Sequence, residues 1–176
     1  MQEFELLSLS HFLGFSICLA AIVFIPKAIR SNPGLENFSK YLLVILLIEN
    51  QIRSTYVETW IKGGNLLENL PLHLCDFSAI VIAAFLLTGF RPLFIFAYFW
   101  GIAGAGMSIL TPDSEFAFPH YEYFATMYGH SLILLAVVFS IVNLGQRPYL
   151  RDIPKLILYS SILLVIMYGI NFILGA

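Results

Sequence analysis

The chain has 176 residues, of which 59% are hydrophobic and only 11% are charged, and its formal net charge is −2. A mean hydropathy of +0.85 lies far above that of a water-soluble domain, so the composition excludes a soluble globular protein and indicates an integral membrane protein. The charge also excludes a nucleic-acid partner, because no basic stripe is present to neutralise phosphates.

Six apolar segments follow one another, each near the ~20 residues that a helix needs to cross a hydrocarbon core. Polar and apolar residues do not alternate as in barrel strands, so the predicted fold class is all-α, a polytopic bundle of transmembrane helices. Short connections without a linker predict a single domain over residues 1–176. The expected spans are Leu6–Ile25, Tyr41–Ile61, Leu70–Thr88, Pro92–Leu110, Tyr123–Leu144 and Ile153–Leu174.

The first span has no charged or ionisable side chain of the acidic or basic types apart from His11, which we expect near the outer interface. It follows the acidic start "MQEFELL", which is unlike the basic start of a secretory signal peptide, so we expect the span to be retained. Cys18 lies in this span without a polar neighbour, as expected of a small buried hydrophobe. Because Cys75 lies in a different span, no disulfide is expected.

The basic residues predict the orientation of the bundle. The second and fourth connections contain only Lys62 between them, whereas the odd-numbered connections carry Lys27, Arg30, Lys40, Arg91, Arg147, Arg151 and Lys155. Basic loops stay in the cytoplasm, so we expect a multi-pass protein of the cell membrane with its N-terminus outside. The segments Glu58–Asn69 and Thr111–Glu122 would then lie on the outer side.

The second span contains the polar run "ENQIR" at residues 49–53. Glu49 and Arg53 are four residues apart and can pair on one face of a helix. Alternatively, Arg53 binds a lipid phosphate while Glu49 holds the guanidinium in place. The sequence leaves both interpretations open.

The third span opens with "NLPLHLCDF", in which Asn69 can cap a helix with Pro71 in its first turn. Cys75 would lie about one turn into this helix, where the helix dipole favours a thiolate, although Asp76 and burial oppose it. His73 lies about 200° around the helix from Cys75. It is therefore a poor direct base for the thiol unless the first turn is irregular.

The fourth span presents a row of small residues along one side. Small side chains at this spacing let two helices approach closely, so we expect a packing role. The row consists of Ala97, Gly101, Ala105 and Ser108.

The fifth span places Tyr123 and His130 on one helix face, from which His130 could reach Cys75. A thiol paired with an imidazole, with Asp113 or Tyr123 to orient the ring, is the arrangement used for nucleophilic acyl transfer. His130 lies deep enough that an ionisable group there indicates function. His120, in "AFPHYEYF", fits an interfacial aromatic belt equally well.

Four segments carry a resemblance to a known family: "LPLHLCDFSAI", "AYFWGIAGAGMSILTPD", "FPHYEYFATMYGH" and "NFILGA". The chain resembles the YwaF-like integral membrane proteins of bacteria and is similar to the eukaryotic transmembrane protein 164, closely over Leu70–Ala176 and loosely over the first two spans. The resemblance implies a polytopic helical membrane protein. Through the eukaryotic relative it also implies a cysteine-dependent acyltransferase that moves fatty acyl chains between phospholipids. Relatives continue past "NFILGA" into a further span, which implies that this sequence lacks a seventh helix.

The resemblance also implies a nucleophile and a histidine. The matching nucleophile is Cys75, and the position of the "YGH" segment assigns the histidine to His130. The chain departs from the eukaryotic pattern in one place, because there a histidine follows the cysteine. Here Asp76 follows the cysteine, and His73 precedes it.

The leading hypothesis is a lipid acyltransferase or acyl hydrolase that uses thiol-dependent acyl transfer and needs no metal or other cofactor. Cys75 attacks an acyl ester, His130 takes the thiol proton, and Asp113 or His73 steadies the imidazole. The expected partners are membrane phospholipids, and no protein partner can be inferred. The candidate substrate-binding residues are Arg53, Glu49, His120 and Tyr123.

Two other classes of function stay open. One is a metal-dependent membrane hydrolase in which His73, His120 and His130, with Asp113 or Cys75, bind zinc, although no His-x-x-x-His pair is present. The other is a transporter or sensor without bond chemistry. In that class Glu49, Arg53 and His130 would form a proton or solute path, although no internal repeat is detectable.

Overall fold

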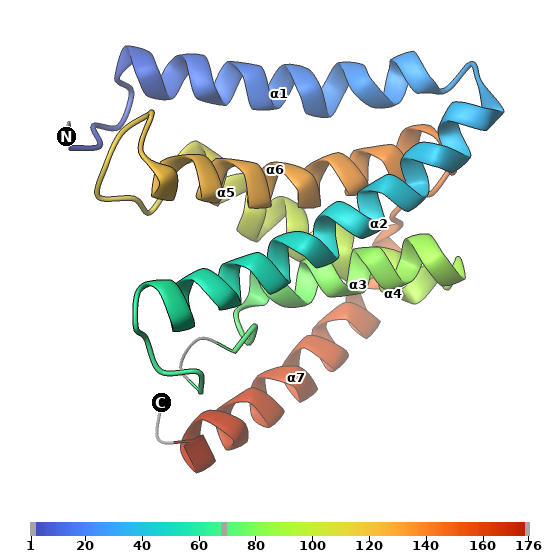
Figure 1. Cartoon of the computed structure of the whole chain (residues 1–176). Coiled ribbons are helices and arrows are strands. Elements are labelled where there is room, and N and C mark those ends of the chain that lie inside the picture. The colour runs from blue at the N-terminus through green and yellow to red at the C-terminus, as the bar shows by residue number, and fades with distance from the viewer. Residues whose placement is uncertain (1–2, 68–69, 175–176) are drawn as a thin grey trace.

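The computed structural model describes residues 3–67 and 70–174, which form six helical rods (Figure 1). The all-helical fold predicted from the composition is confirmed. In chain order the elements are α1 (Leu9–Ile29), α2 (Pro33–Tyr56) continued by the π-helical η1 (Val57–Ile61), α3 (Leu74–Thr88), α4 (Arg91–Trp100) continued by the π-helical η2 (Gly101–Ala105) and α5 (Gly106–Leu110), α6 (Tyr121–Val142), and the 3₁₀-helical η3 (Leu150–Asp152) that leads into α7 (Ile153–Leu174).

The lengths and compositions of these rods are those of a multi-pass membrane protein. Within the described residues, four rods are long and apolar enough to cross a membrane, namely α1, α4 to α5, α6, and η3 with α7. The helix α3 is apolar but shorter, and α2 carries the polar run at residues 49–53. The six rods follow the order of the six predicted segments, but α2 and α3 do not combine the length and hydropathy of the other four.

Helix α3 starts later than expected. It begins at Leu74, and the residue before it, His73, occupies the N-cap position. The backbone N–H of His73 donates a hydrogen bond to Oδ2 of Asp76 (3.0 Å), as in a capping box, and this carboxylate fixes the start of the helix. The expected cap, Asn69, lies outside the described residues. Cys75 is therefore the second residue of the helix, and Pro71 precedes the helix.

Helix α2 starts eight residues earlier than the predicted second span. Asn32 caps it, because its Oδ1 accepts from the N–H groups of Gly34 (3.0 Å) and Leu35 (3.2 Å), and Pro33 occupies the first helical position. Hydropathy marks only the apolar part of a helix. The polar first turns of α2 are instead specified by this cap.

Helix α6 lies in the middle of the bundle and packs against α1, α2, α3 and the α4–α5 rod. The side chains of Phe85, Phe94 and Phe139 are fully buried in the core between these helices. A Cβ at Gly101 would lie 3.1 Å from Cγ2 of Ile133, so the absence of a side chain lets η2 approach α6 closely. The packing role predicted for the small residues of the fourth span is confirmed at this position.

The two ends of the bundle differ in charge. In Figure 1 the connections α1–α2, α3–α4 and α6–α7 gather at one end, and α1 begins and α7 ends at the other. Seven of the nine basic residues belong to the first end, and only Arg53 and Lys62 do not. We call the first end the basic end and the second the opposite end. The positive-inside rule predicts that the basic end is cytoplasmic.

Chemical labelling in intact cells would test this orientation. In a background without Cys18 and Cys75, a cysteine at Ser114 is expected to react with an impermeant maleimide, because the loop before α6 would lie outside. A cysteine at Gln146, in the connection before α7, is expected to react only after the cells are opened. The opposite pattern would invert the orientation.

Candidate functional site

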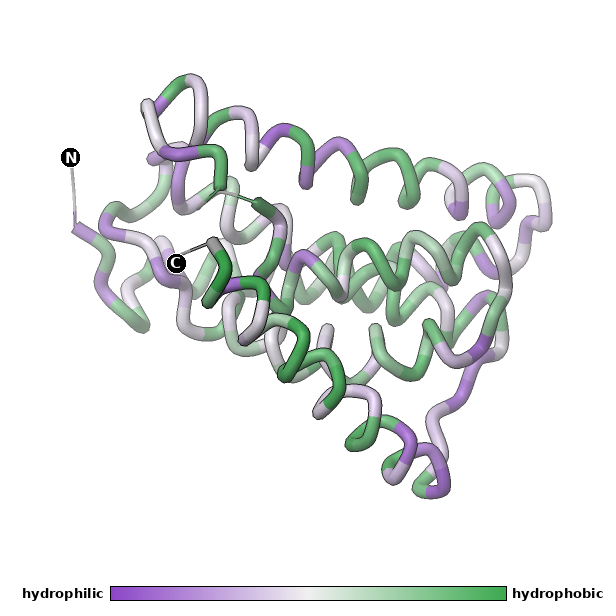
Figure 2. The backbone as a smooth tube through the Cα atoms, turned by 90° about the horizontal axis from the view of Figure 1, so that it is seen from below, coloured by the Kyte–Doolittle hydropathy of each residue, from purple (hydrophilic) through white to green (hydrophobic). Residues whose placement is uncertain are grey.

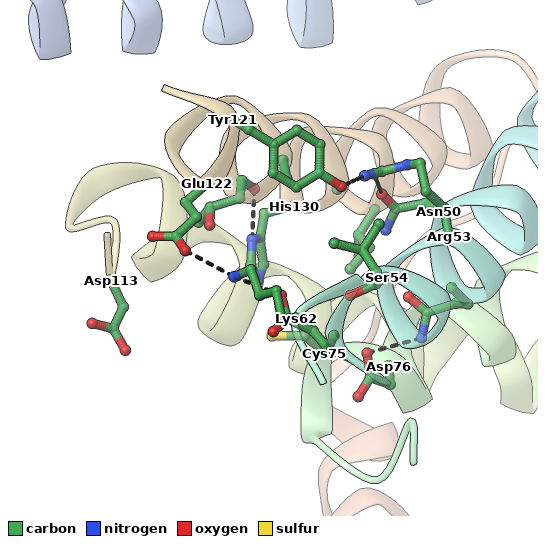
Figure 3. Close-up of a pocket in the computed structure, with 17 residues that line it drawn as sticks. Asn50, Arg53, Ser54, Lys62, Cys75, Asp76, Asp113, Tyr121, Glu122 and His130 are labelled. Atoms are coloured by element: carbon green, nitrogen blue, oxygen red, sulfur yellow. Dashed lines mark hydrogen bonds and ion pairs between the residues drawn. The ribbon is translucent and has the colours of Figure 1, made fainter. Parts of the chain in front are cut away.

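A polar cavity of about 280 Å³ opens at the opposite end of the bundle, where α2 ends and α3 and α6 begin (Figure 3). Four of the residues singled out in the sequence line it. They are Cys75, His130, Asp113 and Arg53. The same cavity is lined by Asn50, Gln51, Ser54, Lys62, Asp76, Tyr121 and Glu122, so it is more polar than the surrounding bundle.

The thiol of Cys75 projects into this cavity from the first turn of α3. A Cβ at Gly104 would lie 3.3 Å from Sγ, so a larger residue at this position would crowd the sulfur. The hydroxyl of Ser108 lies beside the thiol and donates a hydrogen bond to the carbonyl oxygen of Gly104 (3.1 Å). The small residues of the fourth span therefore also form the wall behind the thiol.

The imidazole of His130 enters the same cavity from α6. Its Nδ1 lies 2.8 Å from the carbonyl oxygen of Thr126, one turn earlier on the helix. A carbonyl oxygen can only accept, so Nδ1 carries the hydrogen and donates it. Nε2 is then left with its lone pair, which is the form in which a histidine acts as a base. The backbone of α6 thus selects the tautomer.

Asp76 is the carboxylate that the fold holds most firmly beside these two groups. Its Oδ1 accepts from Nε2 of Gln51 (2.9 Å) and its Oδ2 accepts from the backbone N–H of His73 (3.0 Å). It lies near enough to interact electrostatically with His130. A negative charge there stabilises an imidazolium on His130, but it also disfavours a thiolate on the adjacent Cys75, so Asp76 acts on both partners in opposite senses.

Arg53 lies at the mouth of the cavity and joins α2 to α6. Its Nε lies 3.3 Å from Oε1 of Glu49, as the spacing of four residues predicts. Its Nη2 donates to Oδ1 of Asn50 (2.6 Å) and its Nη1 donates to the hydroxyl of Tyr121 (2.6 Å). The guanidinium also lies over the ring of Tyr128, 5.8 Å from its centroid.

Lys62 makes a second connection across the mouth of the cavity. Its Nζ donates to Oε1 of Glu122 at 2.8 Å and lies 3.0 Å from Oε1 of Glu58. The hydrogen bond to Glu122 is the main reason that the pKa of Lys62 is raised above its ordinary value. Lys62 is therefore charged at neutral pH, and the mouth of the cavity contains two cations.

The sequence profile of the TMEM164 family matches residues 3–176. The chain belongs to the TMEM164 family. Searches of curated proteins and of solved structures gave no match. The part of the resemblance that concerns the YwaF-like proteins of bacteria stays a prediction.

The fold of this TMEM164-family chain keeps two of the sequence candidates away from the cavity. Tyr123 faces α1, where only 3% of its surface is exposed and its hydroxyl lies 3.5 Å from Nδ1 of His11. His11, expected at the interface, is in fact buried, and its Nε2 donates to the carbonyl oxygen of Leu110 (3.1 Å). His120 caps α6, and its ring contacts Phe116 at 4.5 Å between centroids.

The remaining candidates lie near the cavity without facing the imidazole. His73 lines a smaller neighbouring cavity, and Glu49 reaches the site only through its ion pair with Arg53. Asp113 is exposed in the loop before α6, and in Figure 3 it stands apart from the other labelled residues. The group that is hydrogen-bonded to His130 is the Thr126 carbonyl. This partner could not be predicted, because every residue has a backbone carbonyl and the sequence does not indicate which one is used.

In the part of the chain that the structure describes, no three residues of the types His, Cys, Asp and Glu lie together as a group that could hold a metal ion. The histidines proposed as zinc ligands, His73, His120 and His130, are separated as described above. The geometry therefore gives no support to the metal-hydrolase alternative.

Proposed function

We propose that this TMEM164-family protein is a thiol-dependent acyltransferase or acyl hydrolase of membrane phospholipids. The observation that carries the proposal is the 2.8 Å contact between Nδ1 of His130 and the Thr126 carbonyl, because in the neutral ring this hydrogen bond leaves Nε2 as the base, and His130 and Cys75 line one cavity. A nucleophile, a base and a group that orients the base are the three parts that such chemistry requires. Here a backbone carbonyl takes the orienting role.

The reaction would proceed in two steps, formation of a thioester on Cys75 and its cleavage by an acceptor. In the first, His130 takes the proton of the Cys75 thiol, and the sulfur attacks the ester carbonyl carbon of a phospholipid. The ester C–O bond breaks, the departing lysophospholipid oxygen receives the proton from His130, and the acyl chain stays on Cys75 as a thioester. In the second step, His130 takes a proton from an acceptor hydroxyl, whose oxygen attacks the thioester carbonyl carbon. The C–S bond breaks, and the departing sulfur of Cys75 receives the proton from His130. A lysolipid acceptor gives transfer, and water gives hydrolysis.

The cations at the mouth support a phospholipid substrate. Arg53 and Lys62 could each donate hydrogen bonds to a phosphate that displaces a carboxylate partner, Glu49 from Arg53 and Glu58 or Glu122 from Lys62. A cavity of about 280 Å³ is smaller than most ligand pockets, so it suits the ester and part of the headgroup. The acyl chains would then lie outside the cavity, among the membrane lipids.

Trapping the thioester would test the proposal directly. The purified protein is incubated with a phospholipid that carries a labelled acyl chain, quenched in acid, and analysed by peptide mass spectrometry. We expect the mass of the acyl chain on the peptide that contains Cys75, and we expect hydroxylamine to remove it. The Cys18 peptide is the internal control and should stay unmodified. Turnover without a label on Cys75, or equal labelling of both cysteines, would contradict the proposal.

A further inference from the structure

Helix α7 is attached to the bundle at only a few points. At its start, Nη1 and Nη2 of Arg91 donate to the two carboxylate oxygens of Asp152 (3.1 and 2.7 Å). Further along, Nε1 of Trp100 donates to Oγ of Ser160 (3.1 Å). In Figure 1 the helix slants away from the other rods toward its C-terminal end, and Figure 2 shows that its start also stands to one side of them. No residue in its most apolar window is buried.

A cavity of about 550 Å³ separates α7 from α3 and α4. Its wall is almost wholly apolar and rich in aromatic rings. It includes Phe77 and Val81 from α3, Phe96 and Trp100 from α4, and Tyr159 and Leu163 from α7. We call this space the α4–α7 cavity. It is separate from the polar cavity that holds Cys75.

The α4–α7 cavity has a cationic rim at the basic end of the bundle, where Arg91, Asp152 and Lys155 line it. The guanidinium of Arg91 is occupied by Asp152, and that of Arg151 lies 4.8 Å from the centroid of the Tyr149 ring. Lys155 is exposed, and among the described residues it has neither an ion pair nor a hydrogen bond. Its ammonium group is therefore free to bind an anion.

We propose that the α4–α7 cavity binds an anionic phospholipid, with one acyl chain between α4 and α7 and the phosphate at Lys155. An apolar space that ends in a cationic rim complements an anionic amphiphile, and basic pockets between transmembrane helices bind such headgroups. Arg147 and Arg151, in the connection before α7, add positive charge at the same end. They would repel the cationic group of a zwitterionic lipid. The proposal does not depend on the activity of Cys75.

The fluorescence of Trp100 offers a direct measurement, because this residue lines the cavity. The chain has two tryptophans, and Trp60, which is exposed at the opposite end, can be replaced with phenylalanine. The Trp60→Phe protein is placed in phosphatidylcholine bilayers, and lipids with brominated acyl chains are titrated in. Bromine quenches tryptophan on contact. We expect brominated phosphatidylglycerol to quench Trp100 at a several-fold lower mole fraction than brominated phosphatidylcholine does.

Two further variants assign this preference to the rim. Lys155→Gln is expected to reduce the preference by about fivefold, the effect of one basic residue at a membrane surface, and Lys155→Arg to retain it. Lys27→Gln, which removes a cation from the same end but outside the cavity, is the matched control and should change nothing. Equal quenching by the two lipids would overturn the proposal. A preference for phosphatidylglycerol that is unchanged in Lys155→Gln would also overturn it. So would the absence of quenching of Trp100 by either lipid in the Trp60→Phe protein, the result expected if a second copy of the chain covers the cavity.

Discussion

Replacement of Cys75 with serine is expected to lower the rate of acyl transfer by roughly 10⁴-fold or more. Catalytic residues act together, so loss of the nucleophile alone removes nearly all of their combined rate enhancement. The hydroxyl of serine is far less acidic than a thiol and would not form the acyl intermediate at a useful rate. The swap changes little volume beside Gly104, so expression and thermal unfolding should be nearly unchanged. Turnover of a labelled phospholipid by the purified variant measures the effect.

The matched control is Cys18→Ser. Cys18 is partly buried in α1, packs against the apolar core and does not line the polar cavity, so this variant should keep full turnover. If Cys75→Ser retained turnover, the thiol mechanism would be wrong. Equal losses in the two variants would point to a general effect of removing sulfur from the bundle.

Replacement of His130 with glutamine is expected to slow turnover by about 10²–10⁴-fold, the usual contribution of a general base. It should also slow alkylation of Cys75, because only the thiolate reacts and His130 supplies the proton acceptor. The profile of alkylation rate against pH should therefore move to higher pH. The same purified samples are analysed for zinc, and we expect none in either protein.

This experiment separates the three classes of function that the sequence left open. A zinc ligand at position 130 would lower the metal content of the variant, and a residue of a proton path would leave alkylation and metal content alone while disturbing transport. An unshifted alkylation profile together with stoichiometric zinc in the wild type would refute the Cys75–His130 pairing. Tyr123→Phe is a useful control, because Tyr123 faces α1 and should not alter the alkylation of Cys75.

Apolar runs with clear ends allowed the later helices to be predicted well from the sequence. The rod from Arg91 to Leu110 and helix α7 begin within one residue of the predicted positions, because a proline lies at the start of each. The start of α2 was missed because Asn32 and Pro33 specify it through hydrogen bonding and a fixed dihedral angle. The start of α3 was missed because the capping carboxylate, Asp76, lies inside the helix that it caps.

Residues with reactive side chains could be selected from the sequence as candidates, whereas a contact between residues that are distant in the chain could not be predicted. Cys75 and His130 were selected for their reactive groups, and the fold brings both to one cavity. Lys62 was not selected, because its partner Glu122 lies 60 residues away and nothing local in the sequence indicates the pair. Tyr123 shares a helix face with His130 by periodicity. The two residues are about 10 Å apart along the helix axis, so Tyr123 meets α1 while His130 meets the cavity.

The π-helical turn η2 determines which residues of the α4–α5 rod meet the thiol. Such a turn contains one more residue than an α-helical turn, so it rotates everything that follows it by about 100° relative to what precedes it. Trp100, before η2, points toward Ser160 on α7, and Ser108, after it, lies beside Cys75. Deletion of a single residue from Gly101–Ala105 would change the rotational phase between the two halves of the rod. The length of this one turn thus determines which side of α4 contacts α7 when the residues after the turn form the wall behind Cys75.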